Sequence, residues 1–168
     1  MDAILEELAA GIPDARQFTR IVIRLLMAML LGGIVGVQRE HTGKPAGVRT
    51  HMLVALGAAL FVIAPLESGM TSADLSRVIQ GLITGIGFLG GGAILKLSEE
   101  RAIRGLTSAA GIWMTAAIGV AVGLGRLWMA ALSMVMTWFI LAVVDNIERR
   151  ISPPPAQRDD AHERRPEA

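Results

Sequence analysis

Long apolar stretches separated by short charged segments dominate this chain. They cover residues 21–37, 50–66, 78–97, 105–125 and 127–144. A helix needs about 20 mostly apolar residues, with a range of about 17–25, to cross the hydrocarbon core of a bilayer. The pattern therefore predicts an all-α integral membrane protein, a bundle of about five transmembrane helices. Five buried helices in a water-soluble protein are disfavoured, because too little polar sequence remains to cover them.

The two ends of the chain differ from this apolar middle. Residues 1–20 start with an acidic run and contain Pro13, so we expect a short pre-segment there, with an interfacial amphipathic helix as one option. Residues 147–168 carry three consecutive prolines and many charges without an apolar face, which indicates a disordered tail. The transmembrane domain is therefore expected over residues 21–146.

Basic residues decide the expected orientation of the chain. Most of the Lys and Arg outside the spans lie in loops 38–51 and 96–104 and in the C-terminal tail. Short segments rich in Lys and Arg stay on the cytoplasmic side of a membrane. We therefore expect both loops and the C-terminus in the cytoplasm, and the N-terminus on the outer side.

Composition supports a membrane protein and argues against several kinds of chemistry. Apolar residues make up 52% of the chain and charged residues 18%, against about 25% charged residues in soluble domains. The absence of cysteine excludes thiolate metal sites and thiol nucleophiles. The spans contain no Ser–His–Asp set and no carboxylate cluster, so we expect no enzymatic activity, no metal site and no cofactor. The net charge of +1 gives no argument for nucleic acid, and no such partner is expected.

Pairs of glycines four residues apart recur inside the spans. Lipid tails are as apolar as the side chains, so no hydrophobic effect drives transmembrane helices together. Small residues favour their association because they let two backbones approach closely. The pairs predict a tight bundle or a homo-oligomer in contact with the lipid bilayer, and packing within one chain is the alternative. The glycines that we expect to serve helix packing are Gly32, Gly36, Gly81, Gly85, Gly91, Gly119 and Gly123.

The third span is unusually rich in glycine. The segment from Gly81 to Gly92 holds six glycines in twelve residues. Each glycine costs about 1 kcal/mol relative to alanine inside a helix, so the run needs a reason. Close helix contact is one reason, and a broken helix that lines a site, as in transporters, is another.

The segment between the first two spans is short and densely charged. Residues 36–51 hold three cations, one carboxylate and two histidines. One interpretation is a site for phosphate or an anionic lipid headgroup. The alternative is a cytoplasmic topology signal, with an Arg39–Glu40 or Arg49–Glu40 ion pair. His41 and His51 are expected to be polar loop residues rather than metal ligands, because no third ligand is nearby.

Arg24 lies about one helical turn inside the first span. A charged residue at that depth is costly and is a functional candidate by default. The alternative is that its side chain extends to the outer membrane surface. Its expected partners are Glu67 and Asp74 of the outer loop.

Three ordered motif blocks in this chain resemble the MgtC/SapB family of membrane proteins. They are KPAGVRTHMLVALGAALF over residues 44–61, preceded by Arg24, Gly32, Gly36 and Arg39-Glu40, then GIGFLGGGAI over 85–94 and GLTSAAGIW over 105–113. The resemblance covers residues 20–145. It implies a multi-pass protein of the bacterial inner membrane, linked to growth under magnesium limitation and to virulence. It also implies action on a membrane partner such as the ATP synthase, in a short member that lacks the C-terminal soluble domain.

The resemblance also carries over a set of candidate functional residues. They are Arg24, Arg39, Glu40, Lys44, Arg49, Thr50, His51, Gly87, Gly90 and Thr107. We expect a regulatory or interaction role, in which glycine-rich helix faces and the basic loop contact a membrane partner. The alternative is a transporter or channel for a small ion or solute, for example magnesium, with the glycine-rich third span lining the pathway.

Overall fold

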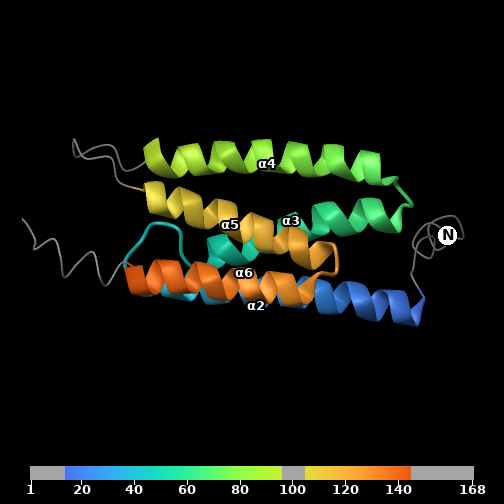
Figure 1. Ribbon diagram of the computed structural model, residues 1–168, viewed down its shortest axis with the longest axis horizontal. Helices are drawn as coiled ribbons and strands as arrows, with labels where there is room; N and C mark the ends of the chain where they lie inside the picture. Colours follow the sequence, from blue (N-terminus) through green and yellow to red (C-terminus); the bar gives the residue numbers. More distant parts are fainter. Residues whose placement is uncertain (1–13, 96–104, 145–168) are drawn as a thin grey trace, which may run out of the picture.

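A computed structural model of the chain describes residues 14–95 and 105–144, and its helices run side by side in one bundle (Figure 1). Our predictions for loop 96–104, for the tail and for most of the pre-segment lie outside the described residues. The helices are α2 (Ala15–His41), α3 (Val48–Glu67), α4 (Ser72–Leu95), α5 (Leu106–Gly123) and α6 (Leu127–Phe139), and a short π-helix, η1 (Ile140–Val144), continues α6.

Five helical segments are long and apolar enough to cross a membrane, with α6 and η1 together forming the fifth. This confirms the predicted all-α membrane fold.

Two helix boundaries have clear local causes. Asp14 precedes α2 and its carboxylate accepts a hydrogen bond from the Gln17 backbone N–H at 2.6 Å, as an N-cap does. Gly105, which precedes α5, has a φ of +98° that favours glycine.

The order of the helices across the bundle differs from their order along the sequence. The α3 helix contacts both α2 and α5, whereas α4 contacts only α3 and α5 among the described helices. In Figure 1, α4 lies along one side of the bundle, α2 and α6 lie along the opposite side, and α5 runs between them. The chain therefore passes through α4 at the periphery before it returns to the centre as α5.

Close backbone contacts at glycines explain the tight packing of α2, α3 and α5. A Cβ atom at Gly32 would lie 2.6 Å from the His51 carbonyl oxygen, and one at Gly36 would lie 2.6 Å from the Val48 Cα. On α5, a Cβ at Gly119 would overlap the Ala55 carbonyl oxygen. Any larger residue at these positions would push the helices apart.

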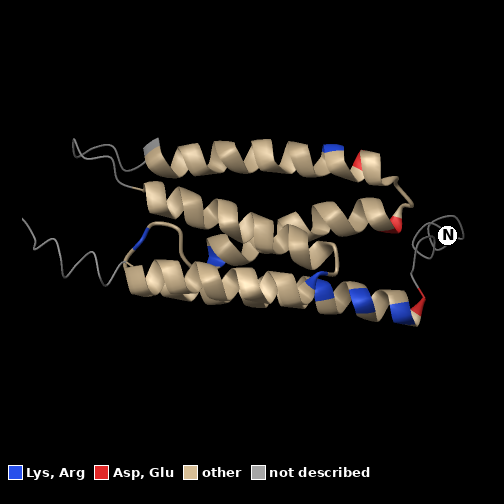
Figure 2. Ribbon diagram, viewed as in Figure 1, with Lys and Arg blue, Asp and Glu red and all other residues tan. Residues whose placement is uncertain are grey.

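The middle of the bundle is apolar. Its main cluster joins α2, α3, α5 and α6 through ten buried residues: Ala28, Leu31, Val35, Ala55, Ala59, Ile63, Ile118, Val122, Ala130 and Leu141. Lys and Arg lie toward the two ends of the bundle (Figure 2). The outer faces carry large exposed apolar side chains such as Leu53 and Trp128, each 68% exposed, as expected for contact with lipid.

Two expectations from the sequence change in the structure. The charged segment is mostly helical, because α2 continues to His41 and α3 begins at Val48, which leaves only residues 42–47 as the connection. The glycine-rich third span is an uninterrupted α-helix from Ser72 to Leu95. A broken helix at this point, one of the two interpretations of the glycine run, is therefore wrong.

Candidate functional site

Arg39 lies almost fully buried at the end of the bundle where α2 ends and α5 begins. Its side chain is 1% exposed, and its Nη2 donates a hydrogen bond to the Ser108 hydroxyl at 3.1 Å. Gly36, one turn earlier, lets α3 approach α2 at this level. A guanidinium that is removed from water in this way is costly, so its surroundings must supply polar contacts.

His51 is also fully buried, which corrects the prediction that it is a polar loop residue. It lies in the first turn of α3, where its Nδ1 is 2.7 Å from the Thr115 hydroxyl oxygen. The Thr115 hydroxyl donates to the Gly111 carbonyl oxygen at 2.9 Å, so its oxygen accepts from the His51 Nδ1–H. Within the described residues, His51 Nε2 has no hydrogen-bond partner.

Arg39 and His51 belong to one buried polar site. Both side chains contact hydroxyls of α5, Arg39 that of Ser108 and His51 that of Thr115. Their partners Ser108 and Thr115 lie on one face of α5. Gly111 lies on the same face, three residues after Ser108 and four before Thr115, which is the spacing of neighbours on one side of a helix. Sequence reasoning missed Ser108 and Thr115, although this spacing of small polar residues in an apolar helix was a usable signal.

Glu40 caps a helix rather than joining the buried site. Its Oε2 accepts a hydrogen bond from the Val48 backbone N–H at 3.0 Å, at the start of α3. A Cβ at Gly47 would lie 2.6 Å from this carboxylate oxygen. A carboxylate at a helix N-terminus is also favoured by the helix dipole. The structure thus gives Glu40 a contact other than the Arg39 or Arg49 pair that the sequence left open.

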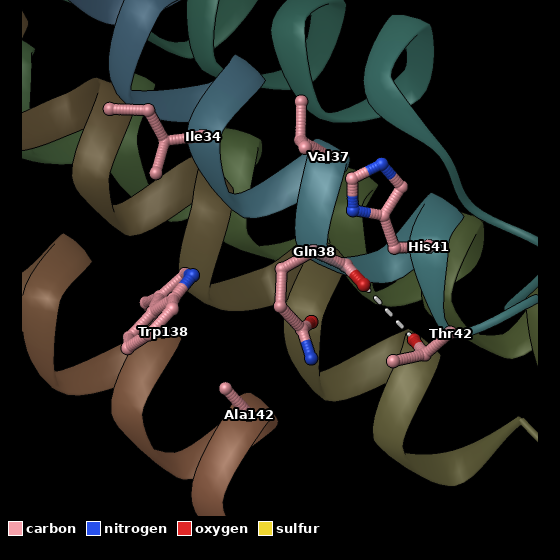
Figure 3. Close-up of a pocket in the computed structure, with 7 residues that line it drawn as sticks. All are labelled: Ile34, Val37, Gln38, His41, Thr42, Trp138 and Ala142. Carbon is pink, nitrogen blue, oxygen red and sulfur yellow. Dashed lines mark hydrogen bonds between the residues drawn. The ribbon is translucent and has the colours of Figure 1, made fainter.

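A pocket of about 420 Å³ opens between the end of α2 and the α6–η1 segment (Figure 3). Gln38 lies in its lining, and its amide donates to the Leu141 carbonyl oxygen at 2.8 Å. Sequence reasoning missed Gln38, and nothing in its local pattern distinguished it. The other lining residues are Ile34, Val37, His41, Thr42, Trp138 and Ala142.

Arg24 lies at the opposite end of the bundle from Arg39. Its Nη1 donates a hydrogen bond to the Gly123 carbonyl oxygen at 3.0 Å, where α5 ends, and its guanidinium lies against Gly125. The last carbonyls of a helix lack partners and carry partial negative charge, so a cation is favoured there. Arg24 therefore contacts the end of α5, whereas Glu67 and Asp74 were the expected partners.

The other predicted residues are scattered. Arg49 and Thr50 are exposed at the start of α3, and Lys44 is half-buried in the preceding connection. Thr107 is exposed and lines a groove between α5 and α6. Gly90 faces Ala109 of α5, where a Cβ would be in ordinary contact at 3.6 Å. From the predicted set, the structure brings the Arg39 and His51 side chains to one face of α5, and the Lys44 backbone N–H donates to the Arg39 carbonyl oxygen at 3.1 Å.

The predicted packing glycines fall into two groups. Gly32, Gly36, Gly119 and Gly123 lie where α2, α3 and α5 nearly touch. On α4, a Cβ would meet no atom within 4 Å in the described part of the chain at Gly81, Gly85, Gly87 or Gly91. The same described ranges hold no group of three or more His, Asp or Glu side chains that could bind a metal ion.

Comparison with known proteins shows the family. The model of the MgtC family matches residues 25–150. SrpB of Synechococcus elongatus is 44% identical over 137 residues, which cover 75% of this chain and 74% of SrpB. The candidate magnesium transporter YhiD of Escherichia coli K12 is 39% identical over 137 residues, covering 77% of this chain and 63% of YhiD.

A third relative bears the family's name. MgtC of Salmonella typhimurium is 42% identical over 105 residues, which cover 62% of this chain but only 44% of MgtC. No solved structure matches the chain. The family model and the relatives at 39–44% identity agree with the motif blocks at residues 44–61, 85–94 and 105–113. The chain is therefore a member of the MgtC family.

Proposed function

We propose that this protein is a regulator that acts by contact with other membrane proteins under magnesium limitation. Its family membership and the magnesium in the name of YhiD support the link to magnesium. The bacterial inner membrane, with the C-terminus in the cytoplasm, is its proposed location, and the charge distribution of the loops supports this orientation. Because the match covers only 44% of MgtC, the activity of that longer protein is carried over to this chain only as a proposal.

The apolar middle of the bundle is the observation that favours regulation over transport. Polar side chains reach from Arg39 and Ser108 at one end of α5 to His51 and Thr115 at its middle, and Arg24 lies at the other end. Between Thr115 and Arg24 the described core is apolar, with buried residues such as Ala28 and Ile118. A hydrated divalent cation needs oxygen ligands or water along its whole path, and this stretch of the described core presents apolar side chains instead.

Two surfaces are proposed to make the contacts. The glycine-rich side of α4, where an added Cβ at Gly81, Gly85 or Gly87 would meet no atom of a neighbouring element within 4 Å in the described part of the chain, serves helix contact and self-association in the bilayer. The exposed residues at the start of α3, Arg49 and Thr50, serve the contact with the regulated partner. Resemblance to the family makes the proton-translocating ATP synthase the first partner to test.

Magnesium flux into proteoliposomes separates regulation from transport. We expect purified protein, reconstituted and shown to be folded, to admit no more magnesium than empty liposomes do, as read by a trapped magnesium-sensitive dye. Flux above that of empty liposomes, lost in Gly87→Leu, would overturn the proposal in favour of transport. Gly87 suits this control because, among the described residues, a Cβ there would meet no atom of a neighbouring element within 4 Å.

Copurification from native membranes tests the partner. Tagged protein, solubilised mildly, should retain the ATP synthase, and Arg49→Glu should reduce the amount retained. The matched control is Arg20→Glu, which reverses an exposed charge at the opposite end of the bundle. Equal loss in both variants, or no ATP synthase with the wild-type chain, would remove this partner.

A further inference from the structure

One buried polar atom in the pocket at the end of α2 lacks a hydrogen-bond partner. Gln38 is 9% exposed, and its side-chain amide reaches into the space between Thr42 and Trp138 (Figure 3). Its Nε2 donates to the Leu141 carbonyl oxygen, whereas its Oε1 meets no donor within the described residues. Because a buried acceptor is costly to leave without a donor, the pocket favours a ligand that supplies one.

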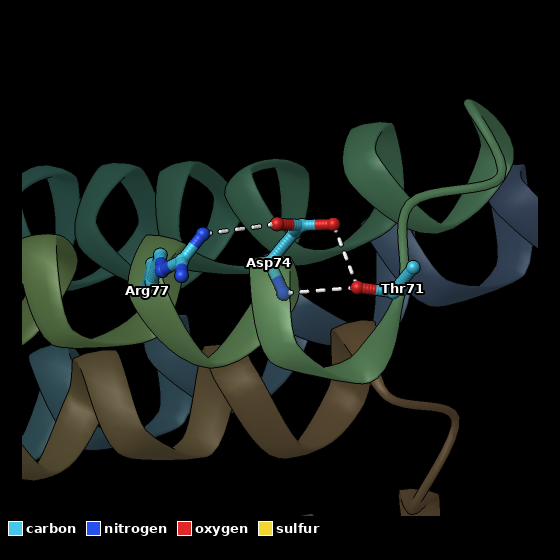
Figure 4. Close-up of polar contacts among 3 residues, drawn as sticks. All are labelled: Thr71, Asp74 and Arg77. Atoms are coloured by element: carbon cyan, nitrogen blue, oxygen red, sulfur yellow. Dashed lines mark hydrogen bonds and ion pairs between the residues drawn. The ribbon is translucent and has the colours of Figure 1, made fainter.

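The polar cluster at the start of α4 differs in this respect (Figure 4). There the Thr71 hydroxyl donates to Asp74 Oδ2 at 2.6 Å, and Arg77 Nη1 lies 3.3 Å from Asp74 Oδ1. The side chains of Arg77 and Asp74 are 78% and 45% exposed, so water completes their hydrogen bonding. This cluster needs no ligand, whereas Gln38 Oε1 still lacks a donor among the described residues.

The pocket combines polar groups with apolar walls. Three of its seven lining residues are polar, and the others include Val37 and Trp138, which are 43% and 44% exposed on the outside of the bundle. Its volume of about 420 Å³ lies within the range of about 300–1,000 Å³ that is usual for small-molecule sites. Such a site suits a ligand with one polar and one apolar part.

The wall opposite α2 is made by an unusual helix. At Ile140 the α6 helix gives way to the π-helix η1, which supplies Ala142 to the pocket and the Leu141 carbonyl to the Gln38 amide. A π-helical turn is rare and is found frequently at functional sites. The pocket thus lies at a local irregularity of the fold as well as at an unpaired acceptor.

The pocket lies at the level of the membrane–water interface. It opens beside the last turns of α2, at one of the two ends of the bundle toward which Lys and Arg lie (Figure 2). Tryptophan is enriched at this level in membrane proteins, because its ring is apolar and its N–H is polar. Since Val37 and Trp138 are exposed on the outside here, phospholipid headgroups have direct access to the pocket.

We propose that this pocket binds a phospholipid whose headgroup carries a hydrogen-bond donor beyond its phosphate, as ethanolamine does. The headgroup ammonium donates to Gln38 Oε1, and the acyl chains follow the apolar wall into the bilayer. The exposed imidazole of His41 supplies an N–H to the phosphate, since imidazole carries at least one N–H in every tautomer. The site is independent of the regulated partner, because neither Arg49 nor Thr50 lines it.

A series of methylated headgroups tests the hydrogen bond on the unmodified chain. Native mass spectrometry measures the affinity of the purified protein for phosphatidylethanolamine, its monomethyl and dimethyl derivatives, and phosphatidylcholine. Only phosphatidylcholine has no N–H. It should bind at least about fivefold more weakly than the other lipids, which should bind alike, because it leaves the buried acceptor unpaired. Equal affinities, an even decline with each methyl group, or tighter binding of phosphatidylcholine through the Trp138 ring would overturn the proposal.

Two further probes separate the donor from other attractions. Phosphatidylglycerol has hydroxyl donors and a net negative charge, and it should also bind more tightly than phosphatidylcholine. If phosphatidylglycerol alone did so, the pocket would recognise charge, and the proposal would fail. Glycerophosphoethanolamine has the same headgroup as phosphatidylethanolamine but no acyl chains. It should not displace the lipid at equal concentration, and displacement would overturn a lipid as the occupant.

A matched pair of variants locates the preference. Gln38→Met keeps the length of the side chain but removes Oε1, so it should bind phosphatidylethanolamine and phosphatidylcholine with equal affinity. Gln80→Met makes the same change at an exposed position of α4 and should keep the preference of the unmodified chain. A preference that persists in Gln38→Met would overturn the role of Gln38. If Gln38→Met does not fold, the methylated series still decides.

Photo-crosslinking in native membranes shows what occupies the pocket. A photoreactive residue at Val37, in the lining, should capture a phospholipid, identified by the mass of the adduct. The control is the same residue at Leu53, which is 68% exposed on α3 and lies outside this pocket. Lipid captured at Val37 should be richer in phosphatidylethanolamine than lipid captured at Leu53. Equal lipid composition at the two positions, or capture of protein instead of lipid at Val37, would overturn the proposal.

Discussion

The Nδ1 atom of His51 and the hydroxyl of Thr115 meet at 2.7 Å although 64 residues separate them in the chain. This contact joins α3 to α5 in the buried part of the bundle. Because the Thr115 hydroxyl donates a hydrogen bond to the Gly111 carbonyl oxygen, the imidazole, the hydroxyl and the carbonyl form a short hydrogen-bonded chain. A change at either end therefore leaves a buried polar atom without a partner.

Replacing Thr115 by valine should destabilise the bundle. Valine has nearly the same shape but no hydroxyl, so the His51 Nδ1–H would lose its acceptor. We expect a fall of about 1–3 kcal/mol in the free energy of unfolding, the usual cost of an unsatisfied buried donor. Thermal unfolding in detergent measures it. Thr84→Val is the control, since the Thr84 hydroxyl is exposed and donates to the Gln80 carbonyl oxygen of its own helix at 3.0 Å. Equal effects of the two variants would contradict the structural role of Thr115.

Two glycine-to-alanine changes should shift stability in opposite directions. At Gly119 a methyl group overlaps the Ala55 carbonyl, and overpacking of this kind costs about 1–3 kcal/mol. At Gly87 the methyl group would meet no neighbouring element within 4 Å in residues 14–95 and 105–144, so the better helix propensity of alanine should raise stability by up to about 1 kcal/mol. Melting temperatures of the two variants check this. A loss of stability in Gly87→Ala would mean that another helix already packs against α4 at Gly87.

Replacing Arg24 by methionine should loosen the turn between α5 and α6. The variant keeps an apolar stem but loses the charged hydrogen bond to the Gly123 carbonyl, which is worth about 1.5–3 kcal/mol. Arg20→Met, at an exposed position one turn earlier, should change stability little. Limited proteolysis near Gly125 provides the measurement. If Arg24→Met stays as protease-resistant as Arg20→Met, the arginine serves some purpose other than holding this turn.

Removing the cap at Glu40 should shorten α3 at its start. In Glu40→Ala the Val48 N–H loses its acceptor, at a cost of about 1 kcal/mol. Glu40→Gln keeps an acceptor oxygen and should lose only part of that. Hydrogen exchange of the first-turn amides of α3 should quicken in the order Gln, then Ala. Unchanged exchange in Glu40→Ala would show that the backbone of this turn needs no cap.

Sequence patterns were sufficient for the helices and for part of their packing. Apolar length alone predicts the five spans, because the bilayer imposes a length on any helix that crosses it. Spacing also placed Gly32, Gly36, Gly119 and Gly123 in the group expected at helix contacts, and each lies beside a neighbouring backbone. The same spacing occurs at Gly81 and Gly85, so a glycine pair does not reveal whether its partner lies in the same chain.

Long-range polar partners could not be predicted from the sequence. The sequence predicts a polar loop residue at His51, since it lies at the end of a charged segment with no third metal ligand nearby, yet α3 begins at Val48 and its first turn buries the imidazole. The partner of Arg24 is a backbone carbonyl, and every residue has one, so no pattern of side chains marks it. Gln38 reaches the Leu141 carbonyl for the same reason without any sequence signal.

The order of packing has a consequence for biogenesis. The α2–α3 hairpin precedes α4 and α5 in the chain, so Arg39 and His51 are synthesised before their partners on α5. Ser108 and Thr115 follow only after α4, which lies at the periphery of the finished bundle. Until then the hairpin holds polar groups in lipid without their final partners. Nascent chains that stop before α5 should therefore be the ones that membrane quality-control proteases recognise and degrade.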